Sequence, residues 1–218
     1  MFQKRIIRIA GIVLTVVATL LFTSCFGIAM ETIFNADGSG RLTMKLRIAQ
    51  FLLEMGEDEA GVGVPLSKDD LTSGYEEVDG VTVVEVTEED TEEDRLITAV
   101  IDFEDFNKLA ADDEFPGEEA SLTVKDGKST FRILVGQPRG GEEGDEEFAS
   151  DPEEEAQMTA MIQSFMEGYS VEYRIVAPRK IQSYSDGEVE KDGRTFVYNL
   201  PMGDFIAIEE PFYIEVVW

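Results

Sequence analysis

The stretch that decides the fold is Leu42-Thr43-Met44-Lys45-Leu46-Arg47-Ile48, in which apolar and polar residues alternate. Such alternation is typical of a β-strand that buries one face and exposes the other. The turn Asp37-Gly38-Ser39-Gly40 precedes it, and another strand-like run, 28–35, precedes the turn. Because Asp-Gly is a strong signal for a tight turn, the pattern predicts a hairpin between 28–35 and 41–48.

Outward from this hairpin, the chain reads as further strands joined by short turns. An acidic turn, 88–94, separates one predicted pair, and Asp126-Gly127 separates the next. Short helices are predicted at 49–55, after Ser67 and at 104–109. The further predicted strands are 81–87, 95–103, 120–124, 129–135, 171–176, 194–199 and 212–218, and 180–184 is a further candidate for extended structure.

The longest predicted helix begins at Asp151 and ends at Gly168. Asp151 suits the N-cap and Pro152 the first helical position. Two interpretations of its apolar stripe stay open. The stripe fills a core against the sheet, or it lines a lipid-sized cavity, because methionine adapts to irregular apolar shapes. The residues of the stripe are Met158, Met161, Ile162, Phe165 and Met166.

These patterns predict an α+β fold with a mainly antiparallel sheet and two to four helices packed on one face. We expect one domain over 25–218, with a flexible acidic loop at about 136–150. Segment 1–24 is expected to be removed as a signal peptide.

The first 25 residues have the order of a bacterial secretory signal. Lys4, Arg5 and Arg8 precede the apolar run 9–21, and Thr23-Ser24 stands directly before Cys25, the single cysteine. This arrangement resembles the lipobox of bacterial lipoproteins, in which the cysteine is lipidated, although Phe22 stands where the lipobox usually has Leu. An uncleaved membrane anchor and simple secretion are the alternatives; Arg8 inside the apolar stretch disfavours the anchor.

Composition excludes several classes of function. Without 1–24 the chain carries 15 Lys+Arg and 46 Asp+Glu, a formal charge of −31. Such a surface repels phosphate backbones, so we expect no nucleic-acid partner and no electrostatic adhesion to an acidic leaflet. Histidine is absent, which removes Ser-His-Asp catalysis and His-ligated zinc. No enzyme activity and no cofactor are expected.

Two acidic segments carry the oxygen ligands that a metal ion could use. Asn35 to Gly40 has the oxygen spacing of an EF-hand loop, but position twelve is Leu46 where a glutamate is needed, so a hairpin turn is favoured. The acid run 142–155 is interpreted as a solvated loop leading into a helix. We therefore expect no metal site.

The strand layout resembles the LppM-type bacterial lipoprotein domain. The resemblance is carried by the first hairpin, by the run Ile101 to Leu109, and by Pro178 to Ser183 ahead of Asp192 to Tyr198. It covers about 26–215. It implies an envelope-anchored α+β domain with lipid binding suggested for relatives, and it implies no catalytic residue.

The sequence thus predicts a noncatalytic lipoprotein of the cell or outer membrane, facing the periplasm or the exterior. Acyl chains on Cys25, palmitate among them, hold it to the membrane, and its domain binds an apolar ligand such as a lipid, or a partner. The first alternative is a structural or assembly lipoprotein that acts through its surface without a ligand. A metal-dependent hydrolase is the distant alternative.

Overall fold

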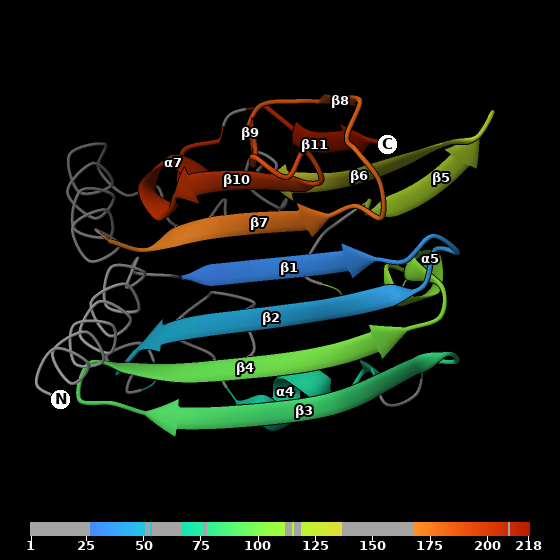
Figure 1. Ribbon diagram of the computed structural model, residues 1–218. Helices are drawn as coiled ribbons and strands as arrows, with labels where there is room; N and C mark the ends of the chain where they lie inside the picture. The colour runs from blue at the N-terminus through green and yellow to red at the C-terminus, as the bar shows by residue number, and fades with distance from the viewer. Residues whose placement is uncertain are drawn as a thin grey trace, which may run out of the picture.

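The computed structural model describes residues 27–50, 53, 67–75, 78–111, 115, 119–136, 168–208 and 210–218. Within them the chain forms two β-sheets, one of seven strands and one of four (Figure 1). The seven-stranded sheet has the order β3-β4-β2-β1-β7-β10-β9, and the four-stranded sheet has the order β5-β6-β11-β8.

The seven-stranded sheet is antiparallel except where β1 and β7 run parallel. A parallel neighbour is possible there because most of the chain separates the two strands. The strands are β1 (Ile28–Phe34), β2 (Gly40–Ala49), β3 (Val81–Asp90), β4 (Asp94–Phe103), β7 (Ser170–Val176), β9 (Glu188–Val189) and β10 (Thr195–Pro201).

The four-stranded sheet is antiparallel throughout its described pairings. In the β5–β6 turn Asp126 has φ 53° and Gly127 has φ 75°, the pair of positive values that a tight type I′ hairpin needs. The strands are β5 (Ser121–Lys125), β6 (Lys128–Gly136), β8 (Ser183–Tyr184) and β11 (Phe212–Val217).

The predicted first hairpin is confirmed. β1 and β2 pair in a register that sets Met30 opposite Met44, and both side chains are buried. Arg41 and Lys45 point to the exposed face, as the alternation predicts. The other two predicted pairs appear as β3–β4 and β5–β6.

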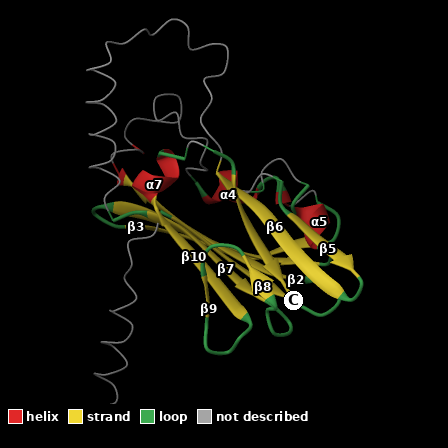
Figure 2. Cartoon of the chain, turned by 90° about the horizontal axis from the view of Figure 1, so that it is seen from above, coloured by secondary structure: helices red, strands yellow, loops and turns green. Residues whose placement is uncertain are grey.

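The predicted α+β class is wrong, because the described chain is mainly β. Its helices are single turns of four or five residues: α4 (Lys68–Thr72), α5 (Phe106–Leu109) and α7 (Met202–Ile206) (Figure 2). A second sheet, and not a helical layer, packs against the apolar face of the seven-stranded sheet. Alternation in β6 and β11 supplies that layer, since Phe131, Ile133 and Val216 all join the buried core. The helix predicted over 151–168 lies outside the described residues, apart from Gly168.

The core between the sheets is rich in aromatic rings. Phe34 lies with its ring centre 5.3 Å from that of Trp218 and 5.3 Å from that of Phe106. Phe103 and Phe131 complete the cluster around it. Large rings at these spacings fill the interior by dispersion and apolar burial.

Different turns and strand ends lie at the two ends of the seven-stranded sheet. The Gly27 end holds Gly27, the β3–β4 turn and the start of β7; the Asn35 end holds the Asn35–Ser39 turn and the end of β7. In Figure 1 the arrows of β1, β4 and β7 point from the Gly27 end to the Asn35 end. None of the described helices is long and apolar enough to cross a membrane.

Candidate functional site

The residues that the sequence singled out lie outside the described part of the chain. These are Cys25 and the stripe Met158, Met161, Ile162, Phe165 and Met166. The lipidation of Cys25 and the role of the stripe therefore stay predictions. The described residues instead show polar sites on the outer face of the seven-stranded sheet and at its two ends.

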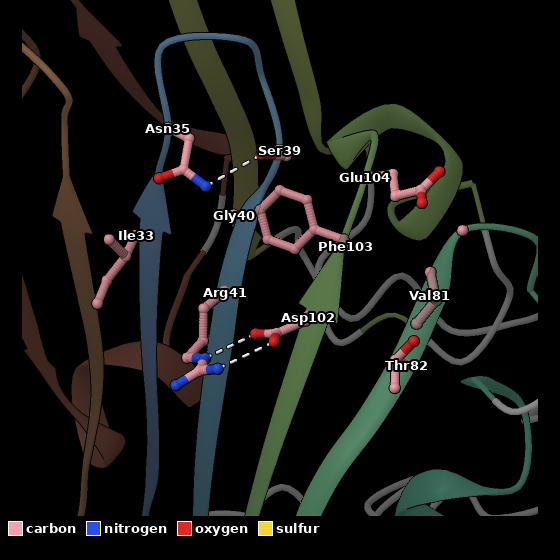
Figure 3. Close-up of a pocket in the computed structure, with 11 residues that line it drawn as sticks. Ile33, Asn35, Ser39, Gly40, Arg41, Val81, Thr82, Asp102, Phe103 and Glu104 are labelled. Atoms are coloured by element: carbon pink, nitrogen blue, oxygen red, sulfur yellow. Dashed lines mark hydrogen bonds and ion pairs between the residues drawn. The ribbon is translucent and has the colours of Figure 1, made fainter.

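An open depression of about 720 Å³ lies on the outer face at the Asn35 end (Figure 3). Its central feature is an ion pair between β2 and β4: Arg41 Nε donates to Asp102 Oδ1 at 2.6 Å, and Arg41 Nη2 donates to Asp102 Oδ2 at 2.9 Å. These hydrogen bonds lower the pKa of Asp102 and raise that of Arg41. Thr82, Asn35 and Glu104 add polar groups to the wall.

The floor of this depression depends on Gly40. A Cβ at this position would lie 2.1 Å from the carbonyl oxygen of Ile33 and 2.6 Å from Cζ of Phe103. Gly40 thus lets β1 and the Phe103 ring approach β2 closely. The resulting surface can hydrogen-bond a polar group. Its two opposite charges, Arg41 and Asp102, neutralise one another.

The Asn35–Ser39 turn closes the same end. Asp37 Oδ1 accepts hydrogen bonds from the Ser39 amide at 3.1 Å and from the Ser39 hydroxyl at 2.7 Å, and these bonds lower the Asp37 pKa. Gly38 has φ 92°, and the Asn35 amide donates to the Ser39 carbonyl at 2.8 Å. The hairpin interpretation is confirmed. Among the described residues, no three acidic or cysteine side chains gather where a metal ion could bind.

A second, smaller hollow of about 100 Å³ lies in the middle of the outer face, over Ala29. Arg174 beside it pairs with Glu31 at 2.8 Å and with Glu190 at 2.6 Å. Half-burial raises the pKa of Glu172, the next charged residue on β7. Charged side chains surround Ala29 and Met30 here, and a hollow of about 100 Å³ is too small for a lipid chain.

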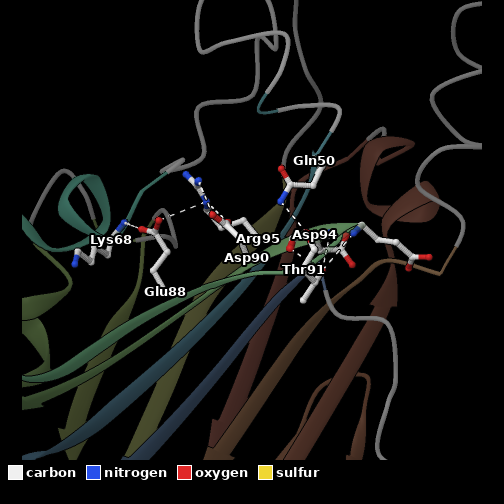
Figure 4. A network of polar contacts seen from close by, with 8 residues as sticks. Gln50, Lys68, Glu88, Asp90, Thr91, Asp94 and Arg95 are labelled. Atoms are coloured by element: carbon white, nitrogen blue, oxygen red, sulfur yellow. Dashed lines mark hydrogen bonds and ion pairs between the residues drawn. The ribbon is translucent and has the colours of Figure 1, made fainter.

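The Gly27 end carries a polar network around the β3–β4 turn (Figure 4). Arg95 Nε lies 2.8 Å from Asp90 Oδ1 and 3.5 Å from Glu88 Oε1. Glu88 also accepts a hydrogen bond from the Lys68 amide at 3.0 Å, which joins α4 to β3. The Gln50 side chain donates to the Thr91 carbonyl at 3.2 Å. The network ties the acidic turn to its neighbours.

A buried ionic triad completes this end. Asp94 is only 4% exposed, yet both of its carboxylate oxygens are used: Arg47 Nε donates to one and the Tyr169 hydroxyl to the other, each at 2.5 Å. The Arg47 guanidinium also lies over the Tyr169 ring, 5.2 Å from its centre. A buried charge is tolerated when it is paired and hydrogen-bonded. We therefore assign the triad to holding β2, β4 and the start of β7 together.

Sequence reasoning missed both Arg–Asp pairs. Their members lie 61 and 47 positions apart, and one arginine among alternating residues looks like any solvated strand position. The position of each residue along its strand could have indicated these pairs. Each pair has one member near an end of β2 and the other near the adjacent end of β4.

Comparisons with known proteins returned one similarity. No protein-family model matches the chain, and no curated protein matches it. A solved structure that is similar is the folded domain of the LppM protein of Mycobacterium tuberculosis, determined by NMR. It shares 13% identity with this chain at a TM-score of 0.43, over 90% of this chain and 91% of that one. Its name is that of the domain family that the sequence resembles.

Proposed function

We propose that this chain is a noncatalytic, lipid-anchored protein of the bacterial envelope whose single domain binds a partner through its outer surface. The observation that carries the proposal is the short distance in sequence from Cys25 to the folded domain. β1 begins at Ile28, three residues after Cys25. Three extended residues span about 10 Å at most.

Such a tether would hold the Gly27 end close to the membrane and present the Asn35 end outward. The acyl chains must supply the attachment, at about 0.8 kcal/mol per buried CH₂, and more than one chain is needed for stable anchoring. Among the described residues of the Gly27 end, the apolar side chains of Met202 and Phe205 on α7 are half-buried.

A surface that binds a partner is supported over an internal lipid site by the packing of the described core. Five large rings, Phe34, Phe103, Phe106, Phe131 and Trp218, contact one another between the sheets. The two hollows described above are open at the surface, and each is lined in part by charged side chains. A lipid chain needs apolar lining, whereas a polar partner does not.

The test of the anchor is metabolic labelling with a fatty acid. Wild type should take up the label and Cys25→Ala should lose it, because the thiol is the acceptor. Ser24→Ala is the matched control: it keeps a small residue before the cysteine and should retain the label. An unlabelled wild type would overturn the anchor.

Native mass spectrometry of the Cys25→Ala protein, extracted gently in detergent, separates the two kinds of binding. This variant lacks the covalent acyl chains, so any lipid that remains is held by the domain. We expect the mass of the bare chain. A retained lipid at a fixed ratio would contradict the surface-binding proposal and favour an apolar ligand.

A further inference from the structure

Six exposed cations gather at the Asn35 end of an otherwise acidic protein. They come from two distant parts of the chain: the β5–β6 turn, and the segments that flank β8 and β9. They form what we call the basic stripe: Lys125, Lys128, Arg179, Lys180, Lys191 and Arg194. The described residues contain 14 Lys and Arg in all, so the stripe holds a large share of them on a few turns.

Contacts between the turns make the stripe continuous. Arg179 Nη2 donates to the Gly127 carbonyl at 2.8 Å, which joins the β5–β6 turn to the segment after β7. The Ile181 amide donates to the Gly193 carbonyl at 2.9 Å, and Lys180 packs against Gly193. The β5–β6 turn, the segment 179–181 and the β9–β10 turn are therefore in contact, and together they carry the six cations.

The stripe keeps most of its positive charge. Within the part of the chain that the structure describes, none of the six forms an ion pair within 4.0 Å. Among the nearby acids, Glu190 pairs with Arg174, and Asp192 accepts hydrogen bonds from the Arg194 and Thr195 amides. The carboxylates of Asp126, Asp186 and Glu188, on the same turns, reduce the excess without forming an ion pair with any member of the stripe.

Repulsion from the rest of the protein is screened at this distance. The acidic β3–β4 turn lies at the opposite end of ten-residue strands. At ~3.3 Å per residue the separation is about 30 Å. The Debye length is ~8 Å at physiological ionic strength, so the acidic β3–β4 turn adds little repulsion at the stripe.

We propose that the basic stripe binds a linear, phosphodiester-bearing polymer of the cell envelope; its outward placement rests on the proposed function. The cations are spread over three turns that contact one another, which suits an extended chain better than a single small anion. Four of the six are lysines, which protein–protein interfaces disfavour and which bind phosphate as point charges. Net charge alone had argued against any anionic partner, but folding concentrates the few cations at one end.

The test measures binding of a labelled poly(glycerol phosphate) of about 20 units to the full chain in detergent micelles, by fluorescence anisotropy at several salt concentrations. The triple variant Lys125→Gln, Lys128→Gln, Lys180→Gln removes three contacts. At 0.1 M salt it should bind about a hundredfold more weakly, and the slope of log K against log salt should fall by about 2.

The matched control is Lys45→Gln, Lys68→Gln, Lys108→Gln, which removes the same charge from exposed lysines outside the stripe. It should change the affinity by less than about threefold, because Lys108 is already paired with Asp79 at 2.7 Å and the charges of Lys45 and Lys68 are screened by distance. Equal weakening by both triples, or no binding of wild type at low salt, would overturn the proposal. Tighter binding to polyglutamate of equal charge would overturn it in favour of an acidic protein partner. Tighter binding to vesicles with 30% phosphatidylglycerol would overturn it in favour of a membrane surface.

These outcomes are independent of lipidation. Cys25→Ala should bind the polymer as wild type does, so a failed labelling experiment and a failed polymer experiment can be told apart.

Discussion

Two arginine–aspartate pairs join the same two strands, β2 and β4, at opposite ends of one sheet. At the Asn35 end, Arg41 and Asp102 are 48% and 45% exposed in their side chains. At the Gly27 end, Arg47 and Asp94 are 23% and 5% exposed, and Tyr169 covers them. Both pairs join an arginine to an aspartate, and they differ in burial and in the added hydrogen bond from Tyr169.

The difference in burial between the two pairs indicates that one end of the sheet is rigid and that the other is available for contact. Exposed ion pairs are worth little because water and salt compete for both partners. Breaking a buried pair is costly because it leaves an uncompensated charge. The Gly27 end, next to the expected anchor, is therefore held by its triad, whereas the Asn35 end can exchange its polar contacts for those of a partner.

The largest effect is expected from Asp94→Ala. Removal of this carboxylate leaves the Arg47 charge and the Tyr169 hydroxyl without their shared acceptor. Stability should fall by about 3–5 kcal/mol. Urea unfolding, followed by tryptophan fluorescence of the buried Trp218, measures the loss. A loss of stability no larger than that from Asp102→Ala would contradict the claim that the buried pair stabilises the fold more than the exposed pair.

Gly40→Ala should give the next largest effect, at the Asn35 end. The new methyl group would meet the Ile33 carbonyl and the Phe103 ring, so the strands must shift, at a cost of about 1–3 kcal/mol. Gly203→Ala in α7 is the matched control, because no heavy atom lies within 4 Å of its Cβ position. There alanine should be neutral or stabilising by up to ~1 kcal/mol. Equal melting temperatures for the two variants would contradict the close approach at Gly40.

Much of the strand order could be predicted from the sequence, because strand alternation and Gly-containing turns are local signals. The β1–β2 hairpin and the turn at Asp126-Gly127 are examples, since each depends on residues only a few positions apart. Two short helices were also predicted from local signals: α4 follows Ser67, and Phe106 and Leu109 bury the single turn of α5, capped by Asp105.

What the sequence could not predict depends on contacts between distant segments. The second sheet joins β6 to β11, whose partners lie about 80 positions apart, and no local pattern specifies that pairing. The basic stripe brings Lys125 and Lys128 beside Arg179 in the same way. A net charge of −28 averages over the chain and conceals such a concentration.

Arg41→Ala is expected to change stability only slightly. The pair is nearly half exposed, so the midpoint of urea unfolding should move by about a fifth or less of the shift that Asp94→Ala causes. The remaining effect should vanish at 1 M salt, because exposed pairs are screened. A shift as large as that of Asp94→Ala would mean that the Asn35 end is held as rigidly as the Gly27 end.

The smallest effect is expected from Asp192, in the turn beside the basic stripe. Hydrogen bonds from the Arg194 amide and from the Thr195 hydroxyl and amide hold the pKa of this carboxylate at about 2. Because the folded pKa lies below the ordinary value of 3.8, its stabilising contribution is present above about pH 4 and is lost as the pH falls toward 2. Carbon-detected NMR titration of the side-chain carboxyl checks the value. A midpoint near 4 would show that the turn opens in solution, and the positions of Lys191 and Arg194 in the stripe would then no longer be fixed by Asp192.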